Sequence, residues 1–153
     1  MTLHVGKIYQ KGDVVLGGGD LNKAKENNLT NYTDQEWNKW REKALKDEDV
    51  YYFSIYYKDL VVGEIFLHDI DKKSKEALVG YHIFNLDMRN KGIGTTALKL
   101  LQEFTKESGK FKKLTIITGQ YNNLSRKISE KCNFTYIGKA DENPRMVVYE
   151  WSI

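Results

Sequence analysis

The chain has 153 residues, of which 41% are hydrophobic and 29% are charged, as in an ordinary soluble globular domain. We therefore predict one domain spanning residues 1–153. The 24 basic and 21 acidic side chains give a net charge of +3, which is too balanced for a nucleic-acid-binding protein. A single cysteine excludes an intrachain disulfide. No stretch approaches about 18 apolar residues, and no apolar signal segment is visible, so we expect a cytoplasmic protein without a membrane partner.

The first fifty residues predict short strands followed by helices. Residues 3–16 alternate loosely between apolar and polar and predict one or two short strands. Residues 17–20, GGGD, form a turn in which Asp20 can cap a helix. Residues 33–46 begin with a capping-box pattern and continue with apolar residues at helical spacing, which predicts a helix.

The middle of the chain predicts a run of three strands. Residues 50–57, 60–70 and 76–84 are rich in aromatic and β-branched side chains. Tight turns at residues 58–59 and 71–74 separate them. Strands joined by such short turns pair antiparallel, so this region is expected to form a β-meander.

The apolar spacing changes to that of helices after Gly92. A helix is predicted from there to Ser108-Gly109, with one apolar face formed by Ile93, Ala97, Leu100, Leu101 and Phe104. A strand over residues 114–118, a short helix with Leu124, Ile128 and Cys132 four apart, and strands over 134–138 and 146–151 follow. This order of elements predicts an α+β domain with a mixed sheet.

The segment RNKGIG, residues 89–94, joins a predicted strand to a predicted helix. Helix N-termini carry free N–H groups and about half a positive charge, and Gly92 and Gly94 allow another group to approach the backbone closely. With the charges of Arg89 and Lys91, the segment predicts an anion site suited to a phosphate or diphosphate. The alternative is an ordinary strand–helix junction with solvated basic residues. The P-loop and dinucleotide-binding motifs are both absent.

Two segments together resemble the GCN5-related N-acetyltransferases, most closely the ribosomal-protein and polyamine acetyltransferase branch. They are GYHIFNLDMRNKGIGTTAL, residues 80–98, and NNLSRKISEKCNF, residues 122–134. The agreement in order and separation covers residues 50–151, and the first 50 residues match only loosely. The resemblance implies an acetyl-CoA-dependent enzyme that transfers acetyl directly to a primary amine of a small molecule or protein. It also implies a mixed, mostly antiparallel sheet of about seven strands flanked by about four helices.

The resemblance implies a coenzyme site as well. Backbone amides of residues 89–95 would hold the diphosphate of acetyl-CoA. Residues 82–84 would pair with the pantetheine arm like an added strand, and a backbone N–H there would stabilise the oxyanion. Arg126 and Lys127 either reach the 3′-phosphate or lie solvated on a helix face. The implied coenzyme-binding residues are His82, Ile83, Phe84, Arg89, Asn90, Lys91, Gly92, Ile93, Gly94, Thr95, Asn122 and Ser125.

Two positions depart from the family pattern. Asn133 stands where glycine is usual, and asparagine is the next best residue for a left-handed helix end. Ser129 stands where many relatives have the tyrosine that protonates the leaving thiolate. Either Ser129 acts in its place through a water, or Tyr121 or Tyr136 does, or the thiolate leaves without a dedicated acid. Ser129 can also be a neutral surface residue.

Acetyl transfer requires a base that removes a proton from the amine, and two residues are candidates. Glu64 interrupts an apolar strand and points either into the cleft or to solvent. His82 is either the base or an ordinary sheet histidine. His68 is in phase with Glu64, but a one-residue shift of the pairing decides whether Glu64 shares a face with His82 or Tyr81. We rank Glu64 first and His82 second.

The remaining features favour a metal-free enzyme with an open choice of acceptor. Cys132 lies on the apolar stripe of its helix and is expected to pack there. No cluster has metal-ligand spacing, so no metal is expected. A polyamine would require several carboxylates, for which residues 47–49 and 141–142 are candidates, and a protein N-terminus would require an open groove. A monomer or homodimer is expected. The alternative function is a catalytically weak CoA-binding module, which the loss of tyrosine at position 129 supports.

Overall fold

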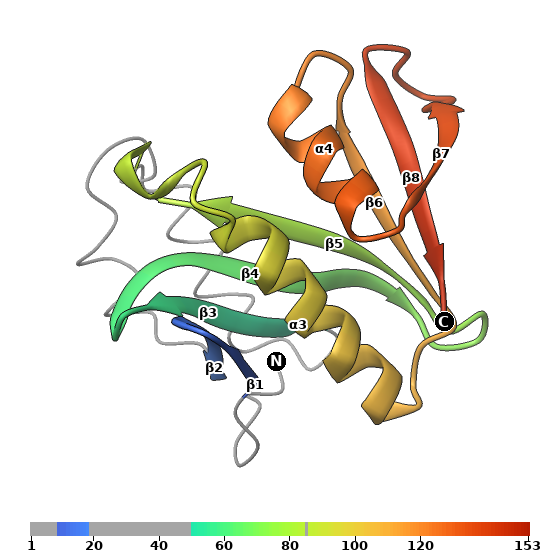
Figure 1. Ribbon diagram of the computed structural model, residues 1–153. Helices are drawn as coiled ribbons and strands as arrows, with labels where there is room; N and C mark the ends of the chain where they lie inside the picture. Colours follow the sequence, from blue (N-terminus) through green and yellow to red (C-terminus); the bar gives the residue numbers. More distant parts are fainter. Residues whose placement is uncertain (1–8, 19–49, 85) are drawn as a thin grey trace, which may run out of the picture.

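The computed structural model describes residues 9–18, 50–84 and 86–153 (Figure 1). The helices predicted near Asp20 and over residues 33–46 lie outside these ranges, as do residues 3–8 of the first predicted strand segment. The described residues form one eight-stranded sheet, two α-helices and a short 3-10 helix.

The sheet has the order β1-β2-β3-β4-β5-β6-β8-β7. Its strands are β1 (Tyr9–Lys11), β2 (Val14–Gly18), β3 (Tyr51–Tyr57), β4 (Leu60–Asp71), β5 (Glu76–Ile83), β6 (Lys113–Gly119), β7 (Thr135–Lys139) and β8 (Met146–Ser152). The helices are η1 (Leu86–Met88), α3 (Ile93–Ser108) and α4 (Asn123–Lys131). Among the described strands, β5 and β6 are the one pair that is parallel, so the predicted mixed, mostly antiparallel α+β fold is confirmed. The described strands number eight rather than about seven.

The predicted meander is present as β3, β4 and β5. Lys58 and Asp59, between β3 and β4, both have positive φ, 49° and 67°, as a two-residue hairpin turn of the primed type requires. The pairing of β4 with β5 shifts by one residue between His68 and Asp71, and Asp69 within this stretch has φ 48°. This bulge decides which residues of the two strands share a face.

Helix α3 covers one face of the sheet with the apolar stripe that its sequence predicts. Ile93, Ala97, Leu100, Leu101 and Phe104 are all buried. The Phe104 ring lies 5.0 Å from that of Phe53 and 5.9 Å from that of Tyr9, measured between centroids. Each such side chain contributes about 1.5–3 kcal/mol on burial. The helix ends at Gly109 in a left-handed conformation, φ 66°, as predicted.

The sheet opens between its two parallel strands. β5 and β6 pair only through Glu76–Leu78 and Lys113–Thr115, and beyond these residues the strands diverge (Figure 1). We call β1–β5 the first half-sheet and β6–β8 the second half-sheet. The Lys113 ammonium joins them near the junction, 3.0 Å from Glu76 Oε1 and 3.1 Å from Glu150 Oε1.

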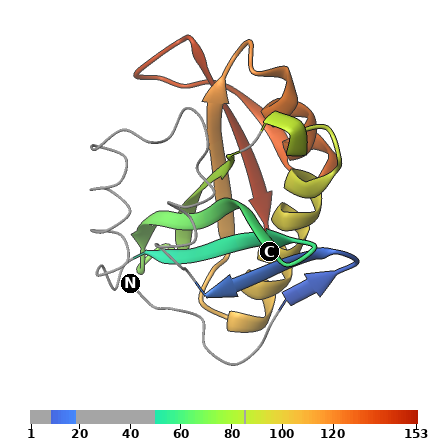
Figure 2. The ribbon, with the colours of Figure 1, turned by 90° about the vertical axis from the view of Figure 1, so that its left-hand side faces the viewer.

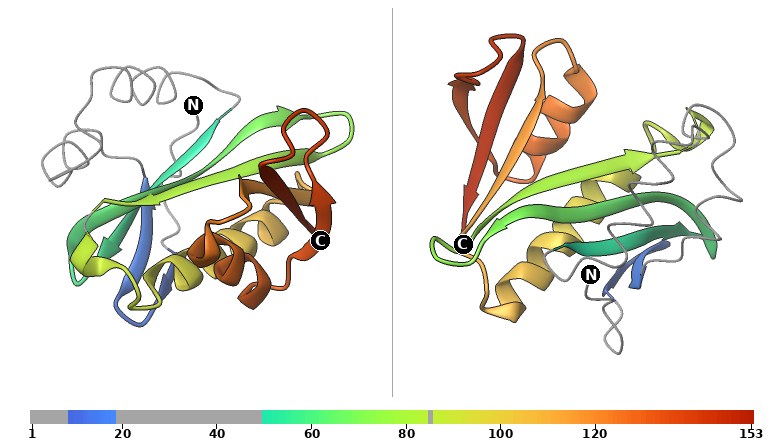
Figure 3. Two further views of the ribbon diagram at one scale, coloured as in Figure 1. Left: turned by 90° about the horizontal axis from the view of Figure 1, so that it is seen from above. Right: turned by 180° about the vertical axis from the view of Figure 1, so that it is seen from behind.

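Helices α3 and α4 lie on the same side of the sheet and contact each other (Figures 2 and 3). In α4, Ile128 and Cys132 are buried, whereas Leu124, the third residue of the predicted stripe, is 41% exposed. Asn133 ends α4 with φ 66°, so the predicted left-handed asparagine is confirmed. No helix within the described ranges is long and apolar enough to cross a bilayer.

Candidate active site

The turn of residues 89–95, which we call the glycine turn, leads from η1 into α3. Gly92 caps the helix with φ 76°, and a Cβ there would meet no atom within 4 Å. The N–H of Thr96 donates to the Gly92 carbonyl over 3.0 Å. The N–H groups of residues 93–95 precede this bond, so they belong to the first helical turn, which has no intrahelical acceptors.

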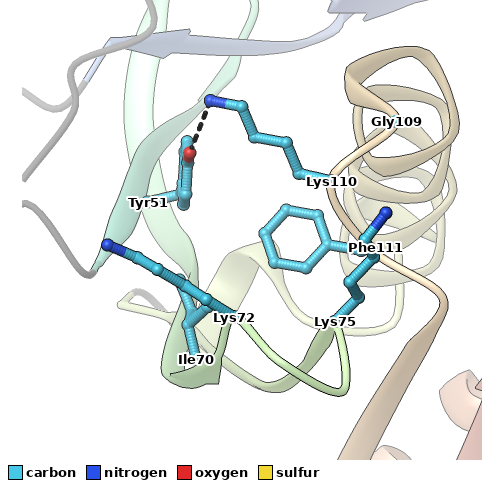
Figure 4. Close-up of a pocket in the computed structure, with 7 residues that line it drawn as sticks. All are labelled: Tyr51, Ile70, Lys72, Lys75, Gly109, Lys110 and Phe111. Atoms are coloured by element: carbon cyan, nitrogen blue, oxygen red, sulfur yellow. Dashed lines mark hydrogen bonds between the residues drawn. The ribbon is translucent and has the colours of Figure 1, made fainter.

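A cavity of about 400 Å³ is present elsewhere, at the other end of α3 (Figure 4). It is lined by Tyr51, Ile70, Lys72, Lys75, Gly109, Lys110 and Phe111. Lys110 donates to the Tyr51 hydroxyl over 3.1 Å. Because α3 has 16 residues, about 24 Å of helix separates this cavity from the glycine turn. It is therefore not part of the site described below.

A cavity of about 270 Å³ faces the glycine turn, and we call it the turn cavity. Helix α4 forms its opposite wall, to which Lys127 and Lys131 contribute. No acidic residue is among its lining residues, so its charge favours an anion. Arg126 is not in this wall, because its guanidinium donates to the Tyr149 hydroxyl and the Gln120 carbonyl. Of the two cations expected near a 3′-phosphate, only Lys127 faces this cavity, and Lys131 was not foreseen.

A second cavity of about 170 Å³ adjoins the first along β5, and we call it the edge cavity. Four lining residues belong to both cavities, namely Ile83, Arg89, Leu124 and Ile128. Tyr81, His82, Asn122 and Ser125 complete the edge cavity. The two cavities together follow the edge of β5 that β6 leaves uncovered.

Residues 82–84 were predicted to pair with the pantetheine arm through their backbone, and in β5 one of the three has backbone groups that point to the open edge. Phe84 N–H donates to the Val62 carbonyl of β4 over 2.8 Å. Successive residues of a strand direct their backbone groups to opposite edges, so Ile83 directs its N–H and carbonyl to the open edge. Phe84 is therefore committed to the sheet, and Ile83 is the residue with backbone groups available to a ligand.

Glu64 is fully buried, with 0% of its surface exposed. The expectation that it could face solvent is therefore wrong. It accepts a hydrogen bond from Tyr52 Oη over 3.0 Å. The β4–β5 register places Glu64 directly opposite His82, and Nδ1 of His82 lies 4.0 Å from Glu64 Oε1. The question of which face Glu64 shares is thus settled in favour of His82 over Tyr81.

His82 connects the buried carboxylate to the edge cavity. Its side chain is 26% exposed and is one of the cavity's lining groups. The Phe66 ring lies 6.3 Å from the His82 ring and stacks on Tyr52 at an interplanar angle of 9°. Gly63 permits the close approach of the strands here, since a Cβ would lie 2.3 Å from the His82 carbonyl oxygen. Among the described residues that line the edge cavity, His82 is the one that lies within 4.0 Å of the Glu64 carboxylate.

Tyr52 was not foreseen as part of this cluster. Ser54 pairs directly with Glu64, and Tyr52 lies two residues before it on the same face. Such diagonal neighbours on paired strands are within reach of long side chains. The sequence does show that Tyr52 and Ser54 lie on one face of their strand. That fact points to Glu64 only once the pairing of β3 with β4 is known.

Ser129 does not face either cavity. It is 0% exposed, and its hydroxyl donates to the Ser125 carbonyl of its own helix over 2.9 Å. This geometry argues against Ser129 as the proton donor to a thiolate, and the surface-residue interpretation is wrong as well. The substitutes Tyr121 and Tyr136, 86% and 46% exposed, line neither cavity.

Cys132 packs against the glycine turn, with its Sγ 3.5 Å from the Thr95 carbonyl oxygen, whereas His68 lies apart from the site. Cys132 is 1% exposed, which confirms its predicted packing role, and burial raises the pKa of its thiol to about 11. His68 shares a face with Phe66, 5.5 Å between ring centroids, but its ring nitrogen lies 2.6 Å from Asp69 at the exposed end of the strand. Among the described residues, no group of three or more His, Cys, Asp or Glu could hold a metal ion.

The basic glycine turn follows β5, where the two parallel strands of the mixed sheet diverge, and this arrangement is suited to a phosphate-bearing ligand. Residues 19–135 match the family model described as Acetyltransferase (GNAT) domain. This match covers more than half of the chain, so the chain belongs to the GNAT acetyltransferase family. The family predicted from the two sequence segments, and the enzyme class with it, are confirmed.

Solved structures with the same fold include three acetyltransferases. Ribosomal L7/L12 alpha-N-protein acetyltransferase RimL in complex with coenzyme A matches with TM-score 0.83 and 16% identity, over 96% of this chain and 98% of its own. The Salmonella typhimurium acetyltransferase that modifies the N-terminal serine of L7/L12 matches with TM-score 0.79 and 18% identity, over 96% of this chain and 99% of its own. Microcin C7 self immunity acetyltransferase MccE, in complex with acetyl-CoA and AMP, matches with TM-score 0.76 and 23% identity, over 94% of this chain and 94% of its own. A search of curated proteins gives no match.

Proposed function

We propose that this protein is an acetyl-CoA-dependent N-acetyltransferase that transfers acetyl directly to a primary amine. One observation carries the proposal: the turn cavity and the edge cavity adjoin along the uncovered edge of β5, with the His82–Glu64 pair at the edge cavity. A coenzyme bound along these two cavities would have its phosphates in the turn cavity and its reactive end in the edge cavity.

The turn cavity suits the diphosphate of the coenzyme. The N–H groups of residues 93–95 supply backbone donors at the positive end of α3. Arg89, Lys127 and Lys131 add side-chain charge around the same cavity. The presence of bound coenzyme A in RimL, and of acetyl-CoA in MccE, supports this ligand for a chain of the same fold.

The edge cavity suits the pantetheine arm and the thioester. Ile83 offers its backbone N–H and carbonyl as a strand edge does to an added strand. Asn122 and Ser125 face it from α4. An Ile83 N–H directed at the thioester carbonyl would stabilise the oxyanion as it develops.

Deprotonation of the amine falls to the His82–Glu64 pair. His82 is exposed to the edge cavity, so it accepts the proton directly or through one water, and the buried Glu64 stabilises the cation that results. The amine nitrogen then bonds to the acetyl carbon, the C–S bond breaks, and the thiolate leaves.

The described walls of the groove favour an acceptor with one amine. None of the residues that line the edge cavity is a carboxylate, whereas a polyamine would require several. The exposed pair Asp141 and Glu142 lines neither cavity. The relatives that act on the N-terminus of ribosomal protein L7/L12 make a peptide α-amine the first substrate class to test.

The proposal is tested in two stages with the purified chain. Calorimetry with acetyl-CoA should show binding, and a thiol reagent should then detect CoA release with a peptide that has a free N-terminus. The same peptide with an acetylated N-terminus is the matched control and should release none. A polyamine and a small monoamine complete the panel. Tight binding with no release for any amine would support the CoA-binding module, and no binding would contradict both functions.

A further inference from the structure

Tyr81 and Ser125 form a pair of hydroxyl groups in the edge cavity. Tyr81 Oη lies 2.8 Å from Ser125 Oγ, and both residues line the cavity. Tyr81 is on β5, next to His82, whereas Ser125 is in the first turn of α4. The bond therefore crosses the opening between the two half-sheets.

Two hydroxyl groups that share one hydrogen bond always retain one further O–H. Each group has a single hydrogen, and only one of the two is used between them. The Ser125 backbone N–H donates to Asn122 Oδ1 over 3.1 Å, which fixes Ser125 at the start of the helix. The pair is thus a positioned donor in the cavity that the reactive end of the coenzyme would enter.

Tyr81 and His82 face the edge cavity from opposite faces of β5. Adjacent residues of a strand point to opposite faces, and His82 is on the face of Glu64. A thioester at the strand edge would then have the base on one side and the hydroxyl pair on the other. The nucleophile and the leaving sulfur require just such separate environments.

We propose that Tyr81, held by Ser125, donates a hydrogen bond to the coenzyme sulfur and stabilises the thiolate that leaves. This inference rests on the proposed function. When the C–S bond breaks, its electron pair stays on sulfur, the amine proton passes to His82, and the phenol keeps its own proton. The thiolate takes a proton from water afterwards.

The environment of Tyr81 suits a donor that does not ionise. Burial raises the pKa of its hydroxyl above the ordinary value of 10.0, against the smaller opposing effect of the bond to Ser125. An ordinary thiol has a pKa of about 8.5, so the proton remains on the phenol and the thiolate receives a hydrogen bond. Ser129, bound to its own helix, leaves this role open.

The test measures the thiol pKa of free coenzyme A bound to the purified chain, through the ultraviolet absorbance of the thiolate. In the wild type this pKa should lie about one unit below that of coenzyme A in solution. Tyr81→Phe should return it to the solution value while calorimetric affinity changes less than about threefold. Tyr51→Phe, a matched change at the far end of α3, should leave the pKa unchanged.

An equal thiol pKa in the wild type and Tyr81→Phe, with coenzyme bound to both, would overturn the inference and leave the proposed function standing. Absence of binding to the wild type would overturn the proposed function itself. If Tyr81→Phe does not fold, Ser125→Ala is used instead, because it keeps the phenol but removes its hydrogen-bond partner. A smaller rise in thiol pKa is then expected, and no rise would count against the pair.

Discussion

The two half-sheets each present the start of a helix to the opening between them, and these two helix starts differ. Helix α4 of the second half-sheet is capped by the Asn122 side chain, which accepts the Ser125 N–H. Helix α3 follows Gly92, which has no side chain to accept a bond. If the coenzyme binds as proposed, its diphosphate would lie at the start of α3 and its neutral polar atoms at the start of α4.

The residues proposed to take part in the reaction are divided in the same way. Glu64, His82 and Tyr52 all belong to strands of the first half-sheet, while Asn122 and Ser125 reach the cavity from the second. In the proposed mechanism, the first half-sheet would therefore carry out proton transfer. On the side of the second half-sheet, Asn122 and Ser125 would supply neutral polar contacts, and Lys127 and Lys131 of α4 would add charge at the turn cavity.

Glu64→Gln should have the largest effect, because it removes the charge behind His82 but keeps an acceptor for Tyr52. We expect turnover to fall about 1,000-fold and coenzyme affinity to stay the same. Turnover is measured with the best amine of the panel, against Glu150→Gln as the matched change in the second half-sheet. An unchanged rate and pH–rate profile would remove Glu64 from the mechanism.

Gly92→Val should lower coenzyme affinity about 100-fold. The side chain would project where the diphosphate approaches, and about two charge-assisted bonds to backbone N–H groups would be lost. Gly12→Val is the matched control, because Gly12 also has positive φ, 60°, and equally open surroundings. Both variants should lose similar stability without ligand. Equal affinity of the two variants in calorimetry would exclude the glycine turn as the anion site.

Asn122→Ala should lower the free energy of unfolding by about 1 kcal/mol, because the α4 cap is lost. Urea denaturation of the ligand-free chain measures this change. Gly92 has no side chain that could stabilise the start of α3 in this way. We therefore expect changes at the start of α4 to lower stability and changes at the start of α3 to lower coenzyme affinity. A large loss of affinity without loss of stability in Asn122→Ala would reverse that assignment.

Lys113→Met should have the smallest effect, about 0.5 kcal/mol, because the ion pairs that join the half-sheets are partly exposed. Hydrogen bonds to Glu76 and Glu150 raise the pKa of Lys113. Its contribution is therefore complete below the ordinary lysine pKa of 10.5 and is lost as the pH rises through the higher value in the fold. The urea midpoints of the wild type and Lys113→Met should therefore converge at alkaline pH. A difference between the midpoints that does not change with pH would contradict this prediction.

The elements of this fold were predictable because their signals are local. Hairpin turns, the Gly109 and Asn133 helix ends, and the apolar stripe of α3 all depend on residues within a few positions of one another. The cavity at the glycine turn has an equally local signal, since its glycines and neighbouring basic residues are nearly consecutive along the chain, and its use as an anion site stays a prediction.

The cluster around the edge cavity was less predictable because its contacts join residues far apart in the sequence. The partners Tyr52 and Glu64 are 12 residues apart, and Tyr81 and Ser125 are 44 apart. The bulge at Asp69 shifts the register by one residue, and without it Glu64 would lie opposite a residue of the other face. The burial of Ser129 likewise depends on how α4 docks, which its own sequence does not specify.

Because the N-cap of α3 is a glycine without a capping side chain, the stability of the protein in a cell can depend on its ligand. If the coenzyme's diphosphate completes this helix, the folded population depends on coenzyme supply, since a ligand at 100 times its Kd adds about 2.7 kcal/mol to stability. We therefore expect melting temperature and resistance to degradation to rise with acetyl-CoA concentration. The abundance of such an enzyme would then follow the cell's supply of the coenzyme, whether free or acetylated.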